Sequence, residues 1–551
     1  MSNMSKKLSV VLAAAMLCGM ASGCSGSNSS SQSQSQSQSQ AQPSGSASTS
    51  PSTSSEAPSE ATLDPVTLEW YVSEGTHPDD STVLGEVSKY MEEQINATLN
   101  THLIPSDEYQ QKVSTIIMSG QSTDIVNAQG SAIGYVDYVR KEAFIPIDEL
   151  LTQYAPKTLA LIPEGYWDAM KIDGKIYGIP SYKDSCEIQS MQYNETMAND
   201  LGITIPDKIH NGQDVYQFMY DAYQKRNEKY PDLASEPITR DMMGIGDFAR
   251  YETISTNLLA ANIPGIEDYK GQGSGEKVFN LYATDEYRDY AHRQAKLVAD
   301  GLVPVQVWYH DQDRIEYYRG DYFFYGIRSG VISVAKNNTS DQFDSAIVPF
   351  DQNIASTNYL HQAVNCISTV SKNPERAMMA LEIINTDPYV ATTLRFGIEG
   401  THWNMSSTEQ GIADFTGTPN EDPSNRAYFC WYGAQFGSIM DLLAVPAGTD
   451  PNLLDGLKAA NESANTNTNM GFIFDPKAVE NEISACSSVV GEYTTDLIWG
   501  FKALEGETYE VVEPKVDAWL DEFLAKLESS GIQKVIDEAQ SQLDTWRAAN
   551  K

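Results

Sequence analysis

The sequence predicts an α/β protein in which helices cover a parallel sheet, and three observations support this. From Val66 onward, segments with the alternating polarity of strands are followed by segments with the apolar spacing of helices, an order typical of parallel sheets. The second half of the chain holds long amphipathic segments, two of which begin at Asn-Pro or Asp-Pro pairs. Finally, 41% of the 551 residues are hydrophobic. That fraction is enough for sizeable cores, and the length corresponds to roughly two to four domains or lobes.

Residues 1–23 have the features of a secretory signal peptide. Two lysines precede an apolar run, residues 8–20, which is too short to cross a bilayer. A stretch of small residues follows this run and ends at Cys24. It resembles the bacterial lipobox, although Ala21 stands where leucine is usual. We therefore expect cleavage before Cys24 and lipidation of its thiol, palmitate included. The lipid would anchor the protein at the extracellular face of the cell membrane.

Residues 24–64 would connect this anchor to the folded part. After Cys24 they are mainly Ser, Gln, Ala, Thr and Pro, so we expect a disordered tether. Removing residues 1–23 takes away two lysines, so the net charge of the mature chain is 35 − 75 = −40. Such an acidic chain argues against nucleic-acid binding and against docking on anionic lipids by a basic surface.

The first elements of the folded part can be placed in order. Residues 66–72 alternate as a strand, and residues 84–95 have helical apolar spacing. A second helix is expected from Ser106 to the glycine at position 120, because Ser106 is a good cap and acidic residues fill the first turn. Residues 124–128 then read as another strand. This strand–helix–strand–helix order indicates a parallel sheet.

Later segments are predicted to be mostly helical. Helices are expected to begin at Pro374, Pro476 and Pro514, and a last one carries apolar residues from Ile532 to Trp546. The middle of the chain, residues 181–365, mixes helical stretches with aromatic-rich loops, and its secondary structure is harder to predict.

Several chemistries are not supported by the sequence. The glycine-rich run at 271–275 lacks the Lys-Ser/Thr pair of a phosphate-binding loop, and neither zinc nor EF-hand calcium patterns occur. We therefore expect no cofactor and no metal, although a calcium site formed by acidic loop residues stays open. After removal of the signal and lipidation of Cys24, four widely spaced cysteines remain: Cys186, Cys366, Cys430 and Cys486. The sequence is compatible both with two disulfides between these cysteines and with four unpaired thiols in the core.

Three stretches carry a family resemblance. Residues 173–184 read DGKIYGIPSYKD, residues 371–404 begin SKNPERAMMALEIINTDPYV, and residues 470–476 read MGFIFDP. With the lipobox and the C-terminal helix, they resemble the extracellular solute-binding lipoproteins of bacterial ABC importers. The likeness is to the carbohydrate-type, family 1-like proteins of the Gram-positive branch with a characteristic C-terminal helical region.

The resemblance implies a two-lobed periplasmic-binding-protein-like fold with a hinge and a ligand cleft between the lobes. Lobe 1 would comprise residues 65–180 and 366–445, and lobe 2 residues 181–365 and 446–551. The first crossing between lobes would lie at residues 178–180, where Gly and Pro suit a hinge.

The resemblance also implies a binding protein without catalytic activity. It would capture an extracellular oligosaccharide by lobe closure and deliver it to the permease subunits of an ABC importer. One alternative is a binder of peptides or of another small polar solute. Another is a surface glycosidase, which would need two carboxylates about 5–9.5 Å apart across a cleft.

Candidate ligand contacts combine aromatic and polar side chains in expected loops. Ligands of open α/β sheets bind beyond the carboxyl ends of the strands, which favours the residues after the strands at 66–72 and 124–128. Convergence of Arg250, Arg328 and Arg395 would instead favour an anionic ligand. The expected contacts are Trp70, Glu74, Gln129 with the neighbouring Asn127, Tyr182, Asp184, Arg250, Trp308, Tyr325, Arg328, Trp403 and Asn404.

Overall fold

The computed structural model describes most of the chain after residue 62. The described residues are 63–129, 133–186, 189–234, 236–239, 254–255, 267–268, 277–303, 323–329, 345–350, 353–408, 411–430, 434–466, 469–499 and 507–550. The predictions for Cys24, the tether, Arg250 and Trp308 lie outside these residues. Tyr325 and Arg328 lie in a described strand, but their side chains are outside the description.

A five-stranded sheet forms the centre of the first lobe, in the order β2-β1-β3-β13-β6. β1 pairs in parallel with β2 and β3, whereas β13 is antiparallel to β3 and to β6. β6 therefore runs in the same direction as β1. The strands are β1 (Val66–Ser73), β2 (Ala97–Ile104), β3 (Ile125–Gln129), β6 (Gly178–Pro180) and β13 (Ala363–Ile367).

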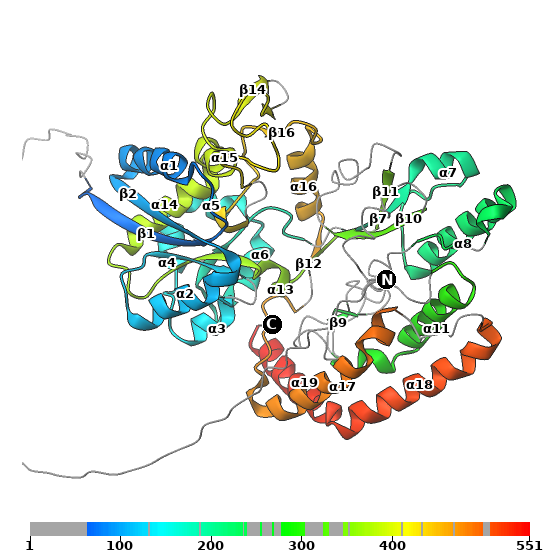
Figure 1. Cartoon of the computed structure of the whole chain (residues 1–551). Coiled ribbons are helices and arrows are strands. Elements are labelled where there is room, and N and C mark those ends of the chain that lie inside the picture. The colour runs from blue at the N-terminus through cyan, green and yellow to red at the C-terminus, as the bar shows by residue number, and fades with distance from the viewer. Residues whose placement is uncertain are drawn as a thin grey trace, which may run out of the picture. The chain divides into compact units, whose positions relative to one another are not determined.

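Helices cover both faces of this sheet (Figure 1). The connection from β1 to β2 and the one from β2 to β3 run in opposite directions across the sheet. Right-handed crossovers therefore place their helices on opposite faces. α14 also packs against α4 and α5. The helices of this lobe are α1 (Asp80–Ile95), α2 (Ser106–Ser119), α3 (Tyr135–Arg140), α4 (Asp148–Tyr154), α5 (Pro156–Leu161), α6 (Glu164–Ala169), α13 (Thr357–Leu360), α14 (Pro374–Thr386), α15 (Pro388–Phe396) and α16 (Leu453–Glu462).

The second lobe contains a three-stranded antiparallel sheet, in the order β10-β7-β11, and long helices. Among these helices, α11 packs against α18, and α17 packs against α18 and α19. The strands are β7 (Gln189–Asn194), β10 (Phe324–Ser329) and β11 (Ser345–Pro349). The helices are α7 (Glu195–Leu201), α8 (Gly212–Lys229), α11 (Asp285–Ala299), α17 (Glu480–Trp499), α18 (Tyr509–Ser529) and α19 (Ile532–Ala549).

Two helix starts differ from the sequence prediction. Pro476 begins a short 3₁₀ segment, Pro476–Val479, and the α-helix follows it. Pro514 lies inside α18 rather than at its start. A proline at that place removes one intrahelical hydrogen bond. The buried side chains Val512, Val516 and Leu520 stabilise the helix across the proline nonetheless.

The hydrophobic cores define which segments belong to each lobe. The core of lobe 1 draws on residues 68–186 and 355–470, and that of lobe 2 on residues 191–350 and 472–543. The chain thus changes core at 186/191, 350/355 and 470/472, compared with the expected 180/181, 365/366 and 445/446. The third change comes later because Leu453, Leu457 and Ala460 of α16 are buried in the core of lobe 1.

Short pairings and close contacts lie at the crossings. β12 (Ile354–Ala355) pairs in parallel with β17 (Asn465–Thr466), so the second and third crossings lie side by side. Gly178, expected in a hinge, is part of the paired strand β6. A Cβ there would lie 2.4 Å from Val364 Cγ1, so glycine permits close strand approach rather than bending. Gly471 has φ +90°, and a Cβ there would lie 2.5 Å from the carbonyl oxygen of Asp168.

A third, smaller core belongs to the segment between α15 and α16. It contains Phe396, Trp403, Ala413, Phe415 and Ala444. Its three-stranded sheet has the order β14-β15-β16, with bounds Asn404–Ser407, Ile412–Asp414 and Val445–Pro446.

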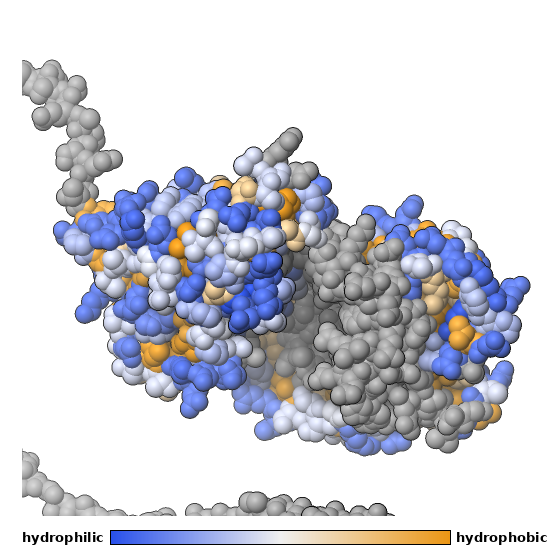
Figure 2. All heavy atoms as spheres, turned by 45° about the horizontal axis from the view of Figure 1, so that its top comes forward, coloured by the Kyte–Doolittle hydropathy of each residue, from blue (hydrophilic) through white to orange (hydrophobic). Residues whose placement is uncertain are grey.

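The polarity of the surface and the state of the cysteines can also be read from the described residues. On the face in Figure 2, the described surface is mostly hydrophilic, with small and separate apolar patches. In the described part, no helix combines the length and hydrophobicity needed to span a membrane. All four cysteines left open by the sequence are buried, and Cys366, Cys430 and Cys486 are free thiols.

Candidate functional site

The most informative polar groups lie at one edge of the lobe 1 sheet. Because β1, β3 and β6 run in the same direction and β13 runs against them, the carboxyl ends of the first three meet the amino end of β13. This edge holds Ser73, Gln129, Pro180 and Ala363. The carboxyl edge of an open α/β sheet is where such folds bind ligands. We call the polar side chains at and beneath this edge the edge site.

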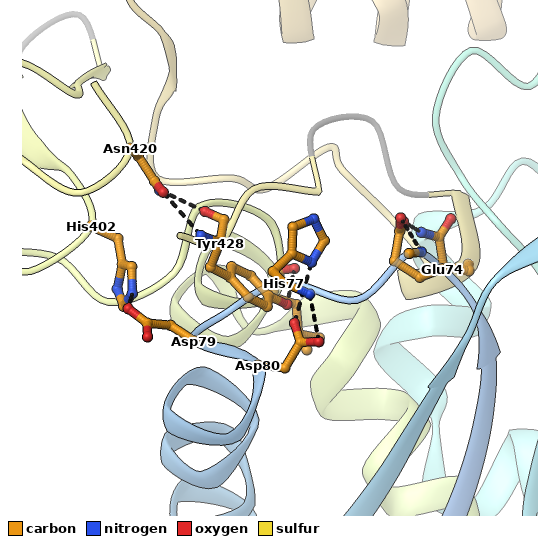
Figure 3. A network of polar contacts seen from close by, with 10 residues as sticks. Glu74, His77, Asp79, Asp80, His402, Asn420 and Tyr428 are labelled. Atoms are coloured by element: carbon orange, nitrogen blue, oxygen red, sulfur yellow. Dashed lines mark hydrogen bonds and ion pairs between the residues drawn. The ribbon is translucent and has the colours of Figure 1, made fainter. Parts of the chain in front are cut away.

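A chain of hydrogen bonds crosses the edge site. The Glu74 carboxylate accepts a hydrogen bond from the Gly75 amide at 2.8 Å and another from the Gln435 side-chain amide (Figure 3). The Gln435 carbonyl oxygen accepts a hydrogen bond from Asn365 Nδ2 at 3.0 Å. Asn365 Oδ1 in turn accepts from Asn127 Nδ2 at 3.4 Å. Residues that are far apart in the sequence are thereby joined into one polar strip.

Burial changes the acid–base property of one member of this strip. Burial raises the pKa of the Glu74 carboxyl, and the hydrogen bond from the Gly75 amide opposes this shift. A partly desolvated carboxylate forms stronger hydrogen bonds than one in bulk water. Glu74 is therefore suited to accept hydrogen bonds from the hydroxyl groups of a solute.

Three buried polar atoms at this edge lack a hydrogen-bond partner among the described residues. They are Trp70 Nε1, Asn127 Oδ1 and Gln129 Oε1. Trp70 pairs with Ile125 across the strands, so Trp70, Asn127 and Gln129 share one face of the sheet. A buried polar atom without a partner costs about 1–3 kcal/mol. One donor and two acceptors on one face of the sheet thus make no hydrogen bond within the described part of the chain.

Of the predicted contacts, Glu74 and Gln129 lie at this edge, whereas Trp70 lies further back on β1, opposite Ile125 at the start of β3. Trp70 is fully buried, and its ring packs edge-on against Phe436 at 5.8 Å between centroids. The Trp70 ring is therefore covered by protein and does not offer a face on which a ligand could stack. Its indole nitrogen is the group without a partner.

Tyr182 and Asp184 also follow a strand of this edge, but both are buried. Tyr182 packs edge-on against Tyr166, and burial raises the pKa of its hydroxyl to about 12. Asp184 contacts the Lys183 ammonium group. The backbone of this stretch is held by α16, because Asn461 accepts a hydrogen bond from the Ser185 amide at 3.0 Å.

Trp403 and Asn404 lie in the segment with the third core. Trp403 is 2% exposed, and its indole nitrogen donates a hydrogen bond to the Gly397 carbonyl at 3.0 Å. The prediction that Trp403 contacts a ligand does not fit this structure, because the ring is buried and Phe396 packs edge-on against it. Asn404 is exposed at the start of β14.

Arg395 does not offer a charge to a ligand. It is fully buried, and it donates hydrogen bonds to the carbonyl oxygens of Ala391 at 2.9 Å and Gly437 at 3.0 Å. Its contribution to a convergent arginine cluster is therefore excluded in this conformation.

Two members of the edge site were not predicted from the sequence. Gln435 lies in a 3₁₀ turn, Ala434–Phe436, and Asn365 lies in the middle of β13. Gln435 is separated from Glu74 by 361 positions. No local pattern marks either residue, although a polar residue inside the otherwise apolar run AVNCI was a usable signal for Asn365.

A separate cavity of about 1000 Å³ lies between α6, the β4–β5 hairpin (Lys171–Ile172 and Lys175–Ile176) and α19. It is lined by Asp173, Phe472 and Trp546, among others, and by none of the edge-site residues. Within the described ranges, no cluster of three or more His, Cys, Asp or Glu residues could hold a metal ion.

Comparison with known proteins places this geometry in context. Residues 87–396 match the family model described as bacterial extracellular solute-binding protein, and residues 468–548 match a domain of unknown function. A carbohydrate ABC transporter substrate-binding protein of Streptococcus pneumoniae is 24% identical over 481 residues, covering 86% of this chain and 89% of that protein.

Solved structures agree with the fold. The N-glycan transport solute binding protein (NgtS) of Streptococcus pneumoniae has a TM-score of 0.69 at 22% identity, covering 89% of this chain and 100% of that one. The same protein in complex with Man1GlcNAc has a TM-score of 0.59 at 21% identity, covering 87% and 99%. The two-lobed α/β architecture is therefore shared with solute-binding proteins.

Proposed function

This chain belongs to the bacterial extracellular solute-binding proteins, and on that premise we propose that it captures an oligosaccharide for an ABC importer. The family is one of binding proteins, so the chain is a receptor for a solute and not an enzyme. The relative in Streptococcus pneumoniae is a carbohydrate transport protein, and NgtS has been solved with Man1GlcNAc. These likenesses favour a saccharide over other solutes.

The observation that carries the proposal is the composition of the edge site. A neutral sugar offers many hydroxyl groups, each of which both donates and accepts hydrogen bonds. The edge site offers a half-buried carboxylate, Glu74, with the acceptors Asn127 Oδ1 and Gln129 Oε1 and the donor Trp70 Nε1. Such a set can bind hydroxyls in both roles. Arg395 is hydrogen-bonded to backbone carbonyl oxygens, so it does not present its charge to a ligand. This further supports a neutral ligand over an anionic one.

The remaining ligand contacts are also part of this proposal. Tyr182 and Asp184 would contribute from the end of β6. Arg250, Trp308, Tyr325 and Arg328 would contribute from lobe 2, and Asn404 from the exposed start of β14. Closure of lobe 2 over the edge site would then trap the sugar, by virtue of its higher affinity for the closed form.

We further propose that the mature protein is held at the outer face of the membrane by acyl chains on Cys24. Residues 25–64 would serve as the tether, and the permease subunits of the importer would receive the closed form. The mass of the mature N-terminal peptide tests the anchor, because lipidated and free Cys24 differ by the mass of the acyl groups.

A thermal-shift screen tests the ligand class. The mature chain is mixed with mannose-containing N-glycan fragments, fructans, milk oligosaccharides, amino acids and short peptides. At 100 times its Kd, a ligand adds about 2.7 kcal/mol to the stability of the folded state, which raises the melting temperature. We expect a shift with one class of oligosaccharide and recovery of that sugar intact. A shift with peptides alone would contradict the saccharide class, and recovery of a cleaved sugar would indicate a glycosidase.

Matched variants connect the shift to the edge site. Glu74→Gln removes the charge but keeps the size of the side chain, and we expect it to weaken oligosaccharide binding about tenfold or more. Glu93→Gln changes an exposed carboxylate on α1 and should bind as the wild type does. Equal affinities of both variants would place the ligand elsewhere.

A further inference from the structure

The loop that joins β1 to α1, Glu74–Asp79, begins at the edge site. It contacts residues from a distant part of the chain, within the described stretches 397–408, 411–430 and 434–436, which we call the clamp segment. The clamp segment lies between the two family matches, which cover residues 87–396 and 468–548.

The clamp segment binds the end of the loop at two points. The Asp79 amide donates a hydrogen bond to the Ala427 carbonyl at 3.0 Å, and Asp79 Oδ2 lies 3.2 Å from His402 Nε2 (Figure 3). His402 Nδ1 accepts a hydrogen bond from the Ile398 amide at 3.0 Å. A neutral ring that accepts at Nδ1 carries its proton on Nε2. His402 therefore donates to Asp79, and its orientation is fixed from both sides.

The middle of the loop rests on a tyrosine of the clamp segment. The ring of His77 lies 5.3 Å from that of Tyr428, between centroids. Asn420 holds the backbone of Tyr428 from both sides, because it accepts from the Tyr428 amide at 3.0 Å and donates to its carbonyl at 2.5 Å. The hydroxyl of Tyr428 donates to the Leu394 carbonyl at 2.9 Å. Three hydrogen bonds thus hold Tyr428, which contacts the His77 ring, in place.

The start of the loop meets the clamp segment at the edge site itself. There the Glu74 carboxylate accepts the hydrogen bond from Gln435, the residue that also continues the polar strip to Asn365. The start, middle and end of the loop therefore each contact a residue of the clamp segment.

We propose that the clamp segment positions the loop Glu74–Asp79, and with it the Glu74 carboxylate, and thereby sets the affinity for oligosaccharide. This inference rests on the proposed function for its ligand. Asp79, His402, Asn420 and Tyr428 are positioning residues that act on the ligand only through the loop. Preorganisation of a binding group lowers the entropic cost of binding, so loosening the loop weakens affinity without removing any ligand contact.

Asp79→Ala is the most direct test. Asp79 precedes α1, but its side chain makes no capping hydrogen bond, and it is 40% exposed. The substitution therefore removes the contact with His402 at little cost to the helix. Asp79→Asn keeps an acceptor oxygen for His402, and Asp107→Ala removes one exposed acid from the first turn of α2 as a charge-matched control.

Two readouts are compared for these variants. Hydrogen–deuterium exchange of peptides covering residues 74–80 measures the loop, and titration calorimetry with Man5GlcNAc and kestose measures affinity. For Asp79→Ala we expect exchange in the loop to rise about tenfold and affinity to fall by a similar factor, the size expected for one charge-assisted hydrogen bond. Asp79→Asn and Asp107→Ala should match the wild type in both.

The outcomes separate this inference from the proposed function. Unchanged loop exchange in Asp79→Ala, or raised exchange with unchanged affinity, would overturn the role of the clamp segment. If the wild type binds neither these two sugars nor any in the screen, the proposed function fails. The exchange data then still decide whether the clamp segment positions the loop.

Discussion

The two lobes use buried polar groups differently. In lobe 1, three buried polar atoms on one face of the sheet, on Trp70, Asn127 and Gln129, lack a hydrogen-bond partner among the described residues. In lobe 2, the buried guanidinium of Arg226 donates hydrogen bonds to the carbonyl oxygens of Leu233, Glu236 and Pro237 and so fixes the turn after α8.

The comparison separates binding chemistry from structural chemistry. The guanidinium of Arg226 makes hydrogen bonds to backbone carbonyls within its own lobe. Gln294 Oε1, on α11, lacks a hydrogen-bond partner among the described residues. The edge site instead keeps several unpaired atoms on one face, at a cost to stability. We therefore expect the unpaired atoms of lobe 1 to serve binding and the buried guanidinium of Arg226 in lobe 2 to serve the fold.

The largest expected effect tests the packing of lobe 2. Phe523 is fully buried in α18, with ring centroids of Tyr282 and Tyr493 within 5.1 Å and 4.9 Å. Phe523→Ala should lower the free energy of unfolding by about 3–5 kcal/mol, because it removes apolar contacts and leaves a cavity. Urea unfolding followed by circular dichroism measures the loss.

The control for this prediction keeps most of the volume. Phe523→Leu should cost less than about 1.5 kcal/mol if the packed volume is what matters. Similar losses for the two variants would show that the ring geometry, rather than the volume, stabilises lobe 2.

The next effect concerns a histidine of lobe 1. His361 Nε2 donates a hydrogen bond to the Ala169 carbonyl at 2.7 Å, and the ring packs on Tyr135. Burial lowers the pKa of His361 from 6.5 to about 4. The unfolded chain therefore binds the proton more tightly, so stability is complete above pH 6.5 and falls as the pH drops from 6.5 to about 4.

The loss over this range should be at most about 3 kcal/mol, since one pKa unit corresponds to about 1.4 kcal/mol. Denaturant unfolding of the wild type and His361→Gln at pH 7, 5.5 and 4 measures it. The difference between the two proteins should shrink with falling pH, because the variant cannot titrate at this position. A constant difference would contradict the assignment to His361.

The sequence predicted the part of this comparison that depends on local patterns. The alternation of Leu68, Trp70 and Val72 and the helix start at Pro374 are each signals within one element, and the structure has β1 and α14 there. Glu74 and Gln129 could be proposed as site residues because each lies just beyond a strand that the sequence predicts, at 66–72 and at 124–128. The fold class followed from the order of such elements.

The remainder depends on pairings across the chain that leave no local trace. Gln435 becomes part of the edge site only because its turn packs against β1, hundreds of positions away. Trp403 reads as an exposed loop aromatic, yet a third core forms around it once Phe415 and Ala444 fold together. The boundary after residue 445 failed to match the cores for the same reason: α16 is amphipathic, and its sequence does not say which lobe its apolar face will join.

The smallest expected effect is also the sharpest, because it has opposite signs for stability and for binding. Gln129→Met keeps the shape of the side chain but removes the buried, unpaired Oε1 atom. Without an oligosaccharide, the variant should be more stable by up to about 1 kcal/mol, since no unsatisfied acceptor remains. Its affinity for an oligosaccharide identified by the screen should fall about tenfold, since the acceptor is lost.

Gln110→Met, at an exposed position on α2, is the control and should change neither stability nor affinity. If Gln129→Met lowered both stability and affinity, the Gln129 amide would have a structural role, and the contrast between the lobes would then rest on Trp70 and Asn127 alone.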